Sequence, residues 1–351
     1  MDTDITIIGA GLTGLSLAYY LRDTGMSINI LEARDRIGGR IHTKYSTHGS
    51  IELGATWFAT EHRSLRELLM ELKVASFEQI IGPLAIYEPL STSPPQLVKL
   101  PPNQPPSFRI KGGTSEIIKK LEANCTATIC LNEKVTSIEK IDDLFQVRTP
   151  LHTHTSKYVI STLPPHLLAN SIDSPLDTDL TFTSIASETH TWMGESIKVG
   201  LTYATPFWRD KSSGTIFSNV GPIPEMYDHS SAEETYFGLM GFLNGAYYSL
   251  SKEERLEMIL TQLTKYYGEQ AKDYQSYEET VWHHEELTST PYASPILPHQ
   301  NNGDPIFQKS YANGRLLLAG TETSPAYSGY MEGAIRSARS TADKLKELFK
   351  Q

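Results

Sequence analysis

The segment 4–40 constrains the fold most, because it has the pattern of a strand, a glycine-rich turn, a helix and a second strand. A β-branched run at 5–8 leads into glycines at 9, 11 and 14, and apolar residues then recur at helical spacing up to position 21. The first glycine allows a tight turn, the second lets a pyrophosphate approach bare backbone, and the third lets helix and strand pack closely. The N–H groups at the helix N-terminus attract the anion. The segment therefore predicts a dinucleotide-binding unit, with the turn formed by Gly9, Gly11, Leu12, Thr13 and Gly14.

An acidic residue stands at the position that would select the nucleotide. Residues 27–31 read as the second strand, and Glu32 follows at its end, 18 residues after Gly14. A carboxylate in this position accepts hydrogen bonds from an adenosine ribose. It favours an unphosphorylated ribose, so the sequence points to FAD or NAD rather than NADP.

Length and composition narrow the class of protein. With 351 residues the chain can form two domains, and its net charge of −10 argues against nucleic acid and anionic membrane surfaces as partners. The first strand begins almost at Met1, which leaves no room for a signal peptide, and no apolar run approaches the roughly 20 residues of a membrane span. The two cysteines, Cys125 and Cys130, read as reduced residues. These features together predict a cytoplasmic protein.

The residues after Glu32 carry a more specific signal. They form EARDRIGGR at 32–40, which resembles the second signature of the flavin monoamine oxidase family. The resemblance implies that Ala33 and Arg34 lie along the adenosine and pyrophosphate, that Gly39 brings backbone to the phosphates, and that Arg40 pairs with them. A solvated basic loop is the alternative interpretation, but this loop directly follows the ribose acid. The resemblance identifies the dinucleotide as FAD.

Two further segments resemble parts of that family that lie beside FAD. In GSIELGATWF, at 49–58, small residues let backbone reach the flavin ring and ribityl chain. The resemblance implies flavin contacts from Gly54, Ala55, Thr56 and Trp57, and a backbone contact from Val135 to the adenine. An ordinary core tryptophan and a plain strand residue are equally compatible interpretations of Trp57 and Val135.

The C-terminal segments RLLLAGTET, at 315–323, and SGYMEGA, at 328–334, are close to diagnostic of the family. A buried strand would deliver an acid to the ribityl-phosphate region. The helix that follows would point its N-terminus at the pyrimidine edge of the flavin, where negative charge collects on reduction. The resemblance implies flavin contacts from Gly320, Thr321, Glu322, Gly329, Tyr330 and Met331.

Lys198 lies in a strand pattern at 195–203, shortly before a Pro-Phe-Trp turn at 206–208. A lysine in such a strand is most often a solvated edge residue. The family, however, carries a lysine in this strand before a similar turn, and that lysine holds a water against the reactive flavin nitrogen. The resemblance therefore implies a catalytic role for Lys198, whose charge would favour reaction of the reduced flavin with dioxygen.

Trp282 and Tyr292 match, in their spacing of ten, a family tryptophan and an aromatic residue that faces the flavin. In the family two aromatic rings flank the amine, and Tyr292 and Tyr330 match them. Their electron-rich faces would orient the amine nitrogen. Covalent members of the family carry a cysteine just before the first aromatic residue. Here that position is Pro291, so the resemblance implies noncovalent FAD.

Seven prolines between 89 and 106 exclude a helix or a central strand and predict an extended surface connection. The family usually has a long, mostly helical part of its substrate domain here, whereas this chain reaches KGGT at 111–114 almost at once. The resemblance thus implies an α/β fold, with a Rossmann-type FAD-binding domain and a discontinuous, shortened α+β substrate domain. The expected division is 1–79, 108–168 and 285–351 for the FAD-binding domain, and 80–107 and 169–284 for the substrate domain.

The resemblance implies a flavoprotein oxidoreductase, an FAD-dependent amine oxidase acting on a C–N bond. The amine would become an imine, which water hydrolyses to an aldehyde and ammonia or an amine, while dioxygen is reduced to hydrogen peroxide. The expected partners are a small amine and dioxygen, without nucleic acid, membrane or metal. The alternatives are a flavin-dependent desaturase or oxidase of the porphyrinogen or carotenoid type, and a flavin-binding protein without turnover.

Overall fold

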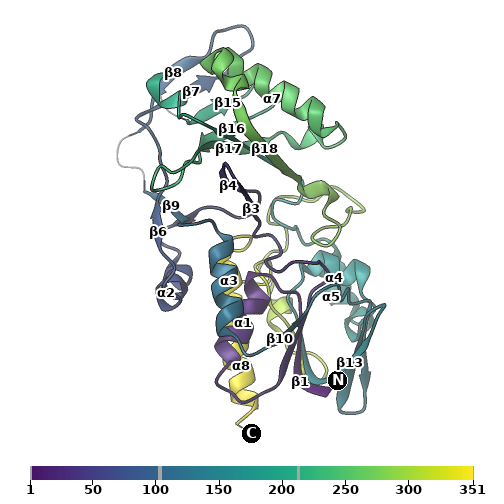
Figure 1. Ribbon diagram of the computed structural model, residues 1–351. Coiled ribbons are helices and arrows are strands. Elements are labelled where there is room, and N and C mark those ends of the chain that lie inside the picture. The colour runs from purple at the N-terminus through teal and green to yellow at the C-terminus, as the bar shows by residue number, and fades with distance from the viewer. Residues whose placement is uncertain (1, 102–104, 212–213, 351) are drawn as a thin grey trace.

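In the computed structural model, which describes residues 2–101, 105–211 and 214–350, two large sheets lie toward opposite ends of an elongated molecule (Figure 1). The N- and C-termini both lie at the end formed by the first sheet (Figure 1). The chain passes between the two ends several times, so each sheet is assembled from segments far apart in sequence.

The first sheet has the order β10-β2-β1-β13-β12-β11, with β19 also paired to β13. The pairs among β10, β2, β1, β13 and β19 are parallel, whereas β12 is antiparallel to both β11 and β13. The strand β2 and the second half of β1, residues 5–8, are buried, as expected where both faces of a sheet are covered. The strands are β1 (Asp2–Ile8), β2 (Ile28–Leu31), β10 (Thr128–Cys130), β11 (Ser137–Ile141), β12 (Leu144–Arg148), β13 (Thr153–Ser161) and β19 (Leu316–Leu318).

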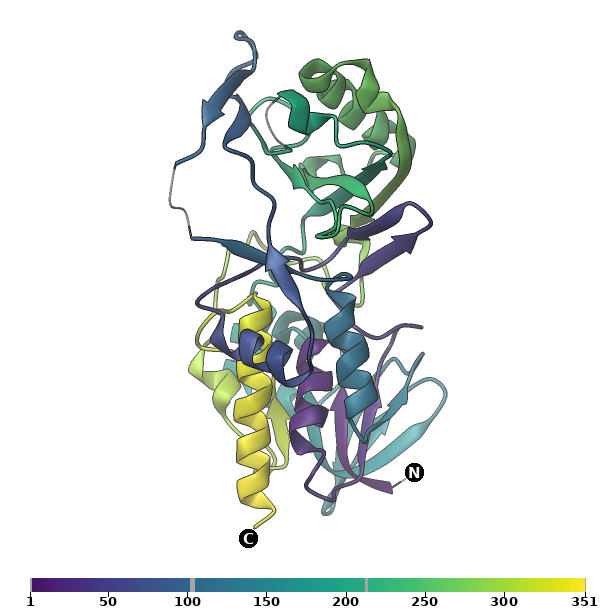
Figure 2. The ribbon, with the colours of Figure 1, turned by 60° about the vertical axis from the view of Figure 1, so that its left-hand side comes forward.

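Helices cover this sheet and complete the predicted α/β fold. Two helices from opposite ends of the chain, α1 (Leu12–Leu21) and α8 (Met331–Leu348), pack side by side, and α3 (Ser115–Asn124) lies against α1 (Figure 2). A shorter helix, α2 (Arg63–Glu71), packs on α8, while α4 (Pro165–Ser171) and α5 (Leu180–Ser187) pack on each other. The sheet shares one hydrophobic core with α1, α2, α3 and α8, and Leu15, Leu17 and Ile335 are fully buried in it.

The second sheet has the order β18-β14-β17-β16-β15-β7-β8 and is antiparallel except for the parallel pair β15 and β7. Helix α7 (Lys252–Tyr267) packs on it through Ile259 and Leu263 (Figure 1). Ser251 and Glu254 form the capping box that their spacing predicts at its N-terminus. The strands are β7 (Leu84–Glu88), β8 (Gln96–Lys99), β14 (Ile197–Tyr203), β15 (Ile216–Ser218), β16 (Glu225–Asp228), β17 (Phe237–Leu243) and β18 (Tyr274–Val281).

The proline-rich segment runs along the edge of this second sheet. Its residues 96–99 form β8, which pairs only on one side, with β7. This agrees with the expected extended connection and adds a pairing that the composition did not predict. Residues 102–104 of the segment lie outside the described residues.

A hairpin and a small sheet connect the two ends of the molecule. The hairpin of β3 (Thr43–Ser46) and β4 (Gly49–Glu52) contacts β14 and β17. Gly200 in β14 allows this approach, since a Cβ there would lie 2.3 Å from Ile51 Cγ2. The small sheet pairs β9 (Ser107–Ile110) with β5 (Phe58–Ala59) and β6 (Ser76–Glu78). The segment 53–57, between β4 and β5, is thereby held between the two large sheets.

Candidate active site

A cavity of about 880 Å³ is lined by residues from both ends of the molecule. Its volume lies within the usual range of ligand pockets, about 300–1,000 Å³. One end is lined by the glycine-rich turn and by residues that follow β2. The other end is lined by Lys198 of β14 and by aromatic side chains: Trp57, Trp192, Phe242, Trp282 and Tyr330.

The glycine-rich turn leaves bare backbone at one end of this cavity. Gly9 has a φ of +103°, and a Cβ at Gly14 would lie 2.0 Å from the carbonyl oxygen of Gly9. Gly11 is different, because a Cβ there would find its nearest neighbours only at 3.9 Å or beyond. Gly11 is also the N-cap of α1 and offers no side chain to cap it. The turn thus presents a helix N-terminus to open space, which suits a pyrophosphate.

The acid at the end of β2 is fixed by backbone hydrogen bonds. Glu32 is buried, and its carboxylate accepts from the N–H of Ala10 at 2.8 Å and from that of Arg34 at 3.0 Å. The side chain of Arg34 reaches across to the 285–288 segment, where it donates to Glu285 at 3.0 Å and to Thr288 at 2.8 Å. Arg34, which follows β2, is therefore hydrogen-bonded to the segment that follows β18, close to Glu32, the acid predicted to bind the ribose.

Arg40 forms a two-bond pair with Glu322. The two hydrogen bonds, of 2.6 and 2.9 Å, join two nitrogens of the guanidinium to both carboxylate oxygens. Such fork-like pairs fix orientation as well as charge. Arg40 lines the cavity, whereas Glu322 does not line it and is only 1% exposed. Glu322 therefore orients Arg40 rather than lining the cavity itself.

Lys198 projects from β14, the second strand from one edge of the second sheet. Strand β14 lies between β17 and β18, and the lysine is only 3% exposed. Its Nζ donates to the carbonyl oxygen of Gly54 at 2.6 Å and to the hydroxyl of Thr56. It also lies 5.1 Å from the ring centroid of Trp57. Burial lowers the pKa of Lys198 from 10.5 to about 7, and the negative charge of Glu52 opposes this shift only in part.

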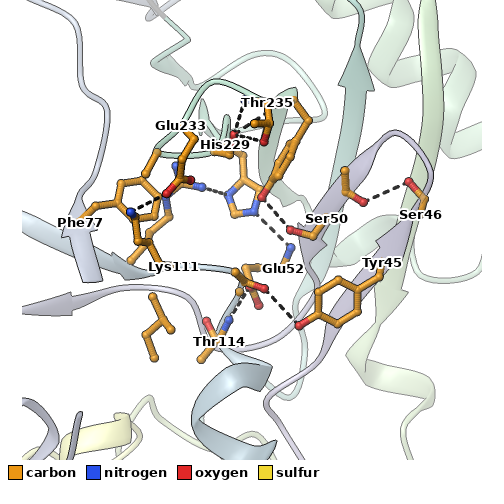
Figure 3. Close-up of a pocket in the computed structure, with 18 residues that line it drawn as sticks. Tyr45, Ser46, Ser50, Glu52, Phe77, Lys111, Thr114, His229, Glu233 and Thr235 are labelled. Atoms are coloured by element: carbon orange, nitrogen blue, oxygen red, sulfur yellow. Dashed lines mark hydrogen bonds and ion pairs between the residues drawn. The ribbon is translucent and has the colours of Figure 1, made fainter. Parts of the chain in front are cut away.

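A second cavity, of about 320 Å³, is lined by buried polar side chains that include Glu52 and His229 (Figure 3). The Glu52 carboxylate accepts from the N–H of Thr114 at 2.7 Å, and its own N–H faces Nε2 of His229 at 3.3 Å. Nδ1 of His229 is 2.8 Å from a guanidinium nitrogen of Arg109. Burial raises the pKa of Glu52 and lowers that of Arg109 to about 10. Burial and the charges of Arg109 and Lys198 hold the pKa of His229 well below its usual value, so this imidazole is neutral near pH 7.

Two aromatic rings face each other at the open part of the large cavity. Tyr330, the N-cap of α8, is 44% exposed, and its ring centroid lies 6.2 Å from that of Trp192. Both residues line the cavity. Tyr292 has a different environment: its hydroxyl accepts from the N–H of Thr191 at 2.8 Å, and its ring lies 4.0 Å from that of His166.

A family model described as "Flavin containing amine oxidoreductase" matches residues 12–93 and 90–346. The chain belongs to this family. It is therefore a flavin-containing oxidoreductase that acts on amine donors, with FAD as the cofactor. The two matched parts meet in the proline-rich segment, at 90–93, where the sequence predicts that the substrate domain is shortened.

Individual relatives agree with this assignment. The chain is 25% identical to a probable flavin-containing monoamine oxidase A of Dictyostelium discoideum, over 98% of this chain and 97% of the relative. That alignment has 451 positions, so at least 100 of them have no residue in this chain of 351. Among solved structures, cyclohexylamine oxidase from Brevibacterium oxydans IH-35A has a TM-score of 0.86 at 20% identity, with 100% of both chains covered. A putrescine oxidase bound to putrescine has a TM-score of 0.84 at 21% identity, with 99% of both chains covered. These two structures show that the fold is shared.

The residues present fit the family's cofactor. The open backbone at Gly11, the fixed acid Glu32 and the cavity volume of about 880 Å³ suit a dinucleotide with an extended ring system. Most of the site residues predicted from the sequence line this one cavity: Gly9, Gly11, Leu12, Thr13, Glu32, Ala33, Arg34, Gly39, Arg40, Gly54, Ala55, Thr56, Trp57, Val135, Lys198, Trp282, Thr321, Gly329, Tyr330 and Met331.

Four predicted residues are described by the structure but lie off the cavity wall: Gly14, Gly320, Glu322 and Tyr292. Gly14 packs against Gly9, Glu322 is hydrogen-bonded to Arg40, and Gly320 donates its N–H to Ser337 at 3.0 Å. The flavin-facing role of Tyr292 stays a prediction.

Sequence reasoning missed several residues that line the cavity, among them Trp192, Glu225 and Phe242. The only signal for Trp192 is its place in a loop just before the lysine strand. Among the described residues, no helix has the length and apolar character needed to span a membrane.

Proposed function

We propose that the protein oxidises a small amine to an imine, which water converts to an aldehyde and ammonia or an amine, while dioxygen becomes hydrogen peroxide. Family membership supports the amine donor. The observation that carries the proposal is the buried Lys198 on the wall of a cavity of dinucleotide size that Trp192 and Tyr330 also line. Bound FAD supplies the acceptor for the hydride equivalent and passes the electrons to dioxygen.

The residues of this chain would position the reactants and hold charge. We propose that Tyr330 forms one aromatic wall beside the amine. The ring opposite it is Trp192, which favours this residue as the second wall, whereas the sequence predicts Tyr292 for that place. Lys198, protonated below a pKa of about 7, would hold positive charge close to where dioxygen is reduced.

We propose that FAD is bound noncovalently, because Pro291 occupies the position at which covalent relatives carry cysteine. Acid precipitation tests this directly. All yellow colour should appear in the supernatant after trichloroacetic acid treatment, and colour retained in the protein pellet would contradict it.

We also propose the domain division 1–79, 108–168 and 285–351 against 80–107 and 169–284, and a cytoplasmic location. The division is supported by the two sheets, whose strands come from these alternating parts of the chain. The location is supported by Cys125 and Cys130, which are both free.

The deciding experiment is a peroxide assay over primary, secondary and polyamine substrates, with the flavin spectrum followed anaerobically. An amine should bleach the flavin, and air should restore the colour with one peroxide formed per amine oxidised. Bleaching by another donor without any amine response would favour a desaturase. A flavin that no donor reduces would favour a binding protein without turnover.

A further inference from the structure

A group of three potential metal ligands lies beside the adenosine end of the large cavity. It consists of Glu133, His152 and His154. One ring nitrogen from each histidine and a carboxylate oxygen of Glu133 all lie within 4.8 Å of one another. Neither histidine has a part in the flavin chemistry described above.

The local fold explains why these side chains meet. His152 directly precedes β13 and His154 is its second residue, and alternate residues of an extended chain point to the same side. Glu133 comes from the loop before β11, where its N–H donates to the carbonyl oxygen of Glu32 at 2.8 Å. The Thr149 hydroxyl donates to the Glu133 carboxylate and so fixes its orientation.

His154 provides a separate observation that points to a ligand. It is only 8% exposed, and its Nε2 is buried without a hydrogen-bond partner. That nitrogen faces Oε2 of Glu133 at 3.6 Å, just beyond hydrogen-bonding distance. A buried polar atom without a partner costs about 1–3 kcal/mol, so such atoms usually have a reason.

We propose that Glu133, His152 and His154 bind a divalent transition-metal ion of the zinc class. Two imidazole nitrogens and one carboxylate, with a fourth position left for water, are a common zinc ligand set. Ligands around tetrahedral zinc lie about 3.3–3.5 Å apart. The Glu133–His154 separation of 3.6 Å is close to this, and Nδ1 of His152, now 2.5 Å from Oε1 of Glu133, would move outward.

The exposure of the three residues also suits an ion that enters from solvent. The His152 side chain is 63% exposed, while Glu133 and His154 form the buried floor. Thr149 would not bind the ion itself but would orient the Glu133 carboxylate through its hydrogen bond, as residues around metal ligands commonly do.

Calorimetric titration of chelator-treated, FAD-loaded protein with ZnCl₂ tests the proposal. We expect one ion bound per chain, and His152→Gln or His154→Gln should weaken binding more than about tenfold. The matched control is His48→Gln, which removes an exposed histidine from the β3–β4 turn and should leave binding unchanged. Millimolar Mg²⁺ should not compete, because it prefers oxygen ligands. Zinc binding by the His152→Gln, His154→Gln double variant that equals wild-type binding, or competition by Mg²⁺, would overturn the proposal.

A second measurement avoids variants that fail to fold. Wild-type protein is treated with diethylpyrocarbonate, with and without ZnCl₂, and each histidine is followed by mass spectrometry. Zinc should slow modification of His152 at least about tenfold and leave His48 unaffected. Equal modification rates of His152 in the two samples would overturn the proposal.

Discussion

The sheet around β1 and the sheet around β14 contribute to one cavity by different means. The first supplies mainly backbone: the turn at Gly9 and Gly11 gives N–H groups and open space. The second supplies a buried side chain, Lys198, whose charge depends on Glu52 and Arg109. The glycine-rich turn depends on close packing that a single added methyl group would disrupt. Loss of one charged neighbour of Lys198 should instead change the lysine pKa only in part, because several groups influence it.

The largest expected effect lies in the backbone site. In Gly14→Ala the new Cβ would lie 2.0 Å from the carbonyl oxygen of Gly9, so the turn must move. We expect essentially complete loss of bound FAD and a loss of about 3 kcal/mol or more in the free energy of unfolding. The measurement is flavin absorbance per mole of protein, together with thermal melting.

The matched control for this change is Gly25→Ala, where no atom lies within 4 Å of the added Cβ. Its φ of +75° should cost only about 1–2 kcal/mol, and flavin should be retained. A Gly14→Ala protein with normal flavin content would show that the backbone site tolerates change as well as the side-chain site does.

The next effect concerns the aromatic rings. Tyr330→Leu and Trp192→Leu should each lower kcat/KM about tenfold or more, because each removes a cavity ring that we propose to flank the amine. Tyr292→Leu should have a smaller effect, since that side chain does not line the cavity. Steady-state kinetics normalised to bound flavin provide the comparison. If Tyr292→Leu lowers kcat/KM strongly while Trp192→Leu does not, Tyr292 is the second wall, as the sequence predicts.

A smaller effect should appear as a change in pH dependence. Lys198 is charged below its pKa of about 7, so flavin reoxidation should slow as the pH rises through that value. Negative charge on the reduced flavin would move the midpoint upward. Glu52→Gln removes a charge that raises the lysine pKa and should shift the profile to lower pH. Arg109→Gln removes a charge that lowers it and should shift the profile to higher pH.

Shifts in the same direction for these two variants would show that Lys198 is not the titrating group. Rates of reoxidation, measured by stopped flow between about pH 6 and 9 around the lysine pKa, decide the matter.

The smallest effect is expected away from the cavity. Ser251→Ala breaks the capping box of α7, in which the Ser251 hydroxyl accepts from the Glu254 N–H at 3.2 Å. We expect a loss of about 1 kcal/mol in the free energy of unfolding, with flavin content and kcat unchanged. Chemical denaturation and a standard assay measure both. A change in flavin content would mean that α7 contributes to the site and not only to the fold.

The same contrast explains how much the sequence could predict. The family and the α/β fold are confirmed, because the signals at 4–40 and 315–334 are local: each turn, strand and helix lies within one short segment. The first helix, α1, ends at Leu21, where its apolar pattern stops.

The burial of Lys198 and the contacts between distant side chains could not be predicted from such local signals. The strand pattern alone favours a solvated edge position for Lys198, but β17 and β18, which come later in the chain, bury it from both sides. The Glu52, Arg109 and His229 group joins residues up to 177 positions apart. Trp192 lies 138 residues before Tyr330 in the sequence, and their rings are neighbours in the fold. No short sequence motif predicts either of these groupings.

The role of Lys198 is tested most directly by Lys198→Met, studied in separate half-reactions. Amine should reduce the flavin at nearly the normal rate, while reoxidation by dioxygen should slow about 100-fold or more. Equal slowing of both half-reactions, or no slowing of reoxidation, would contradict it.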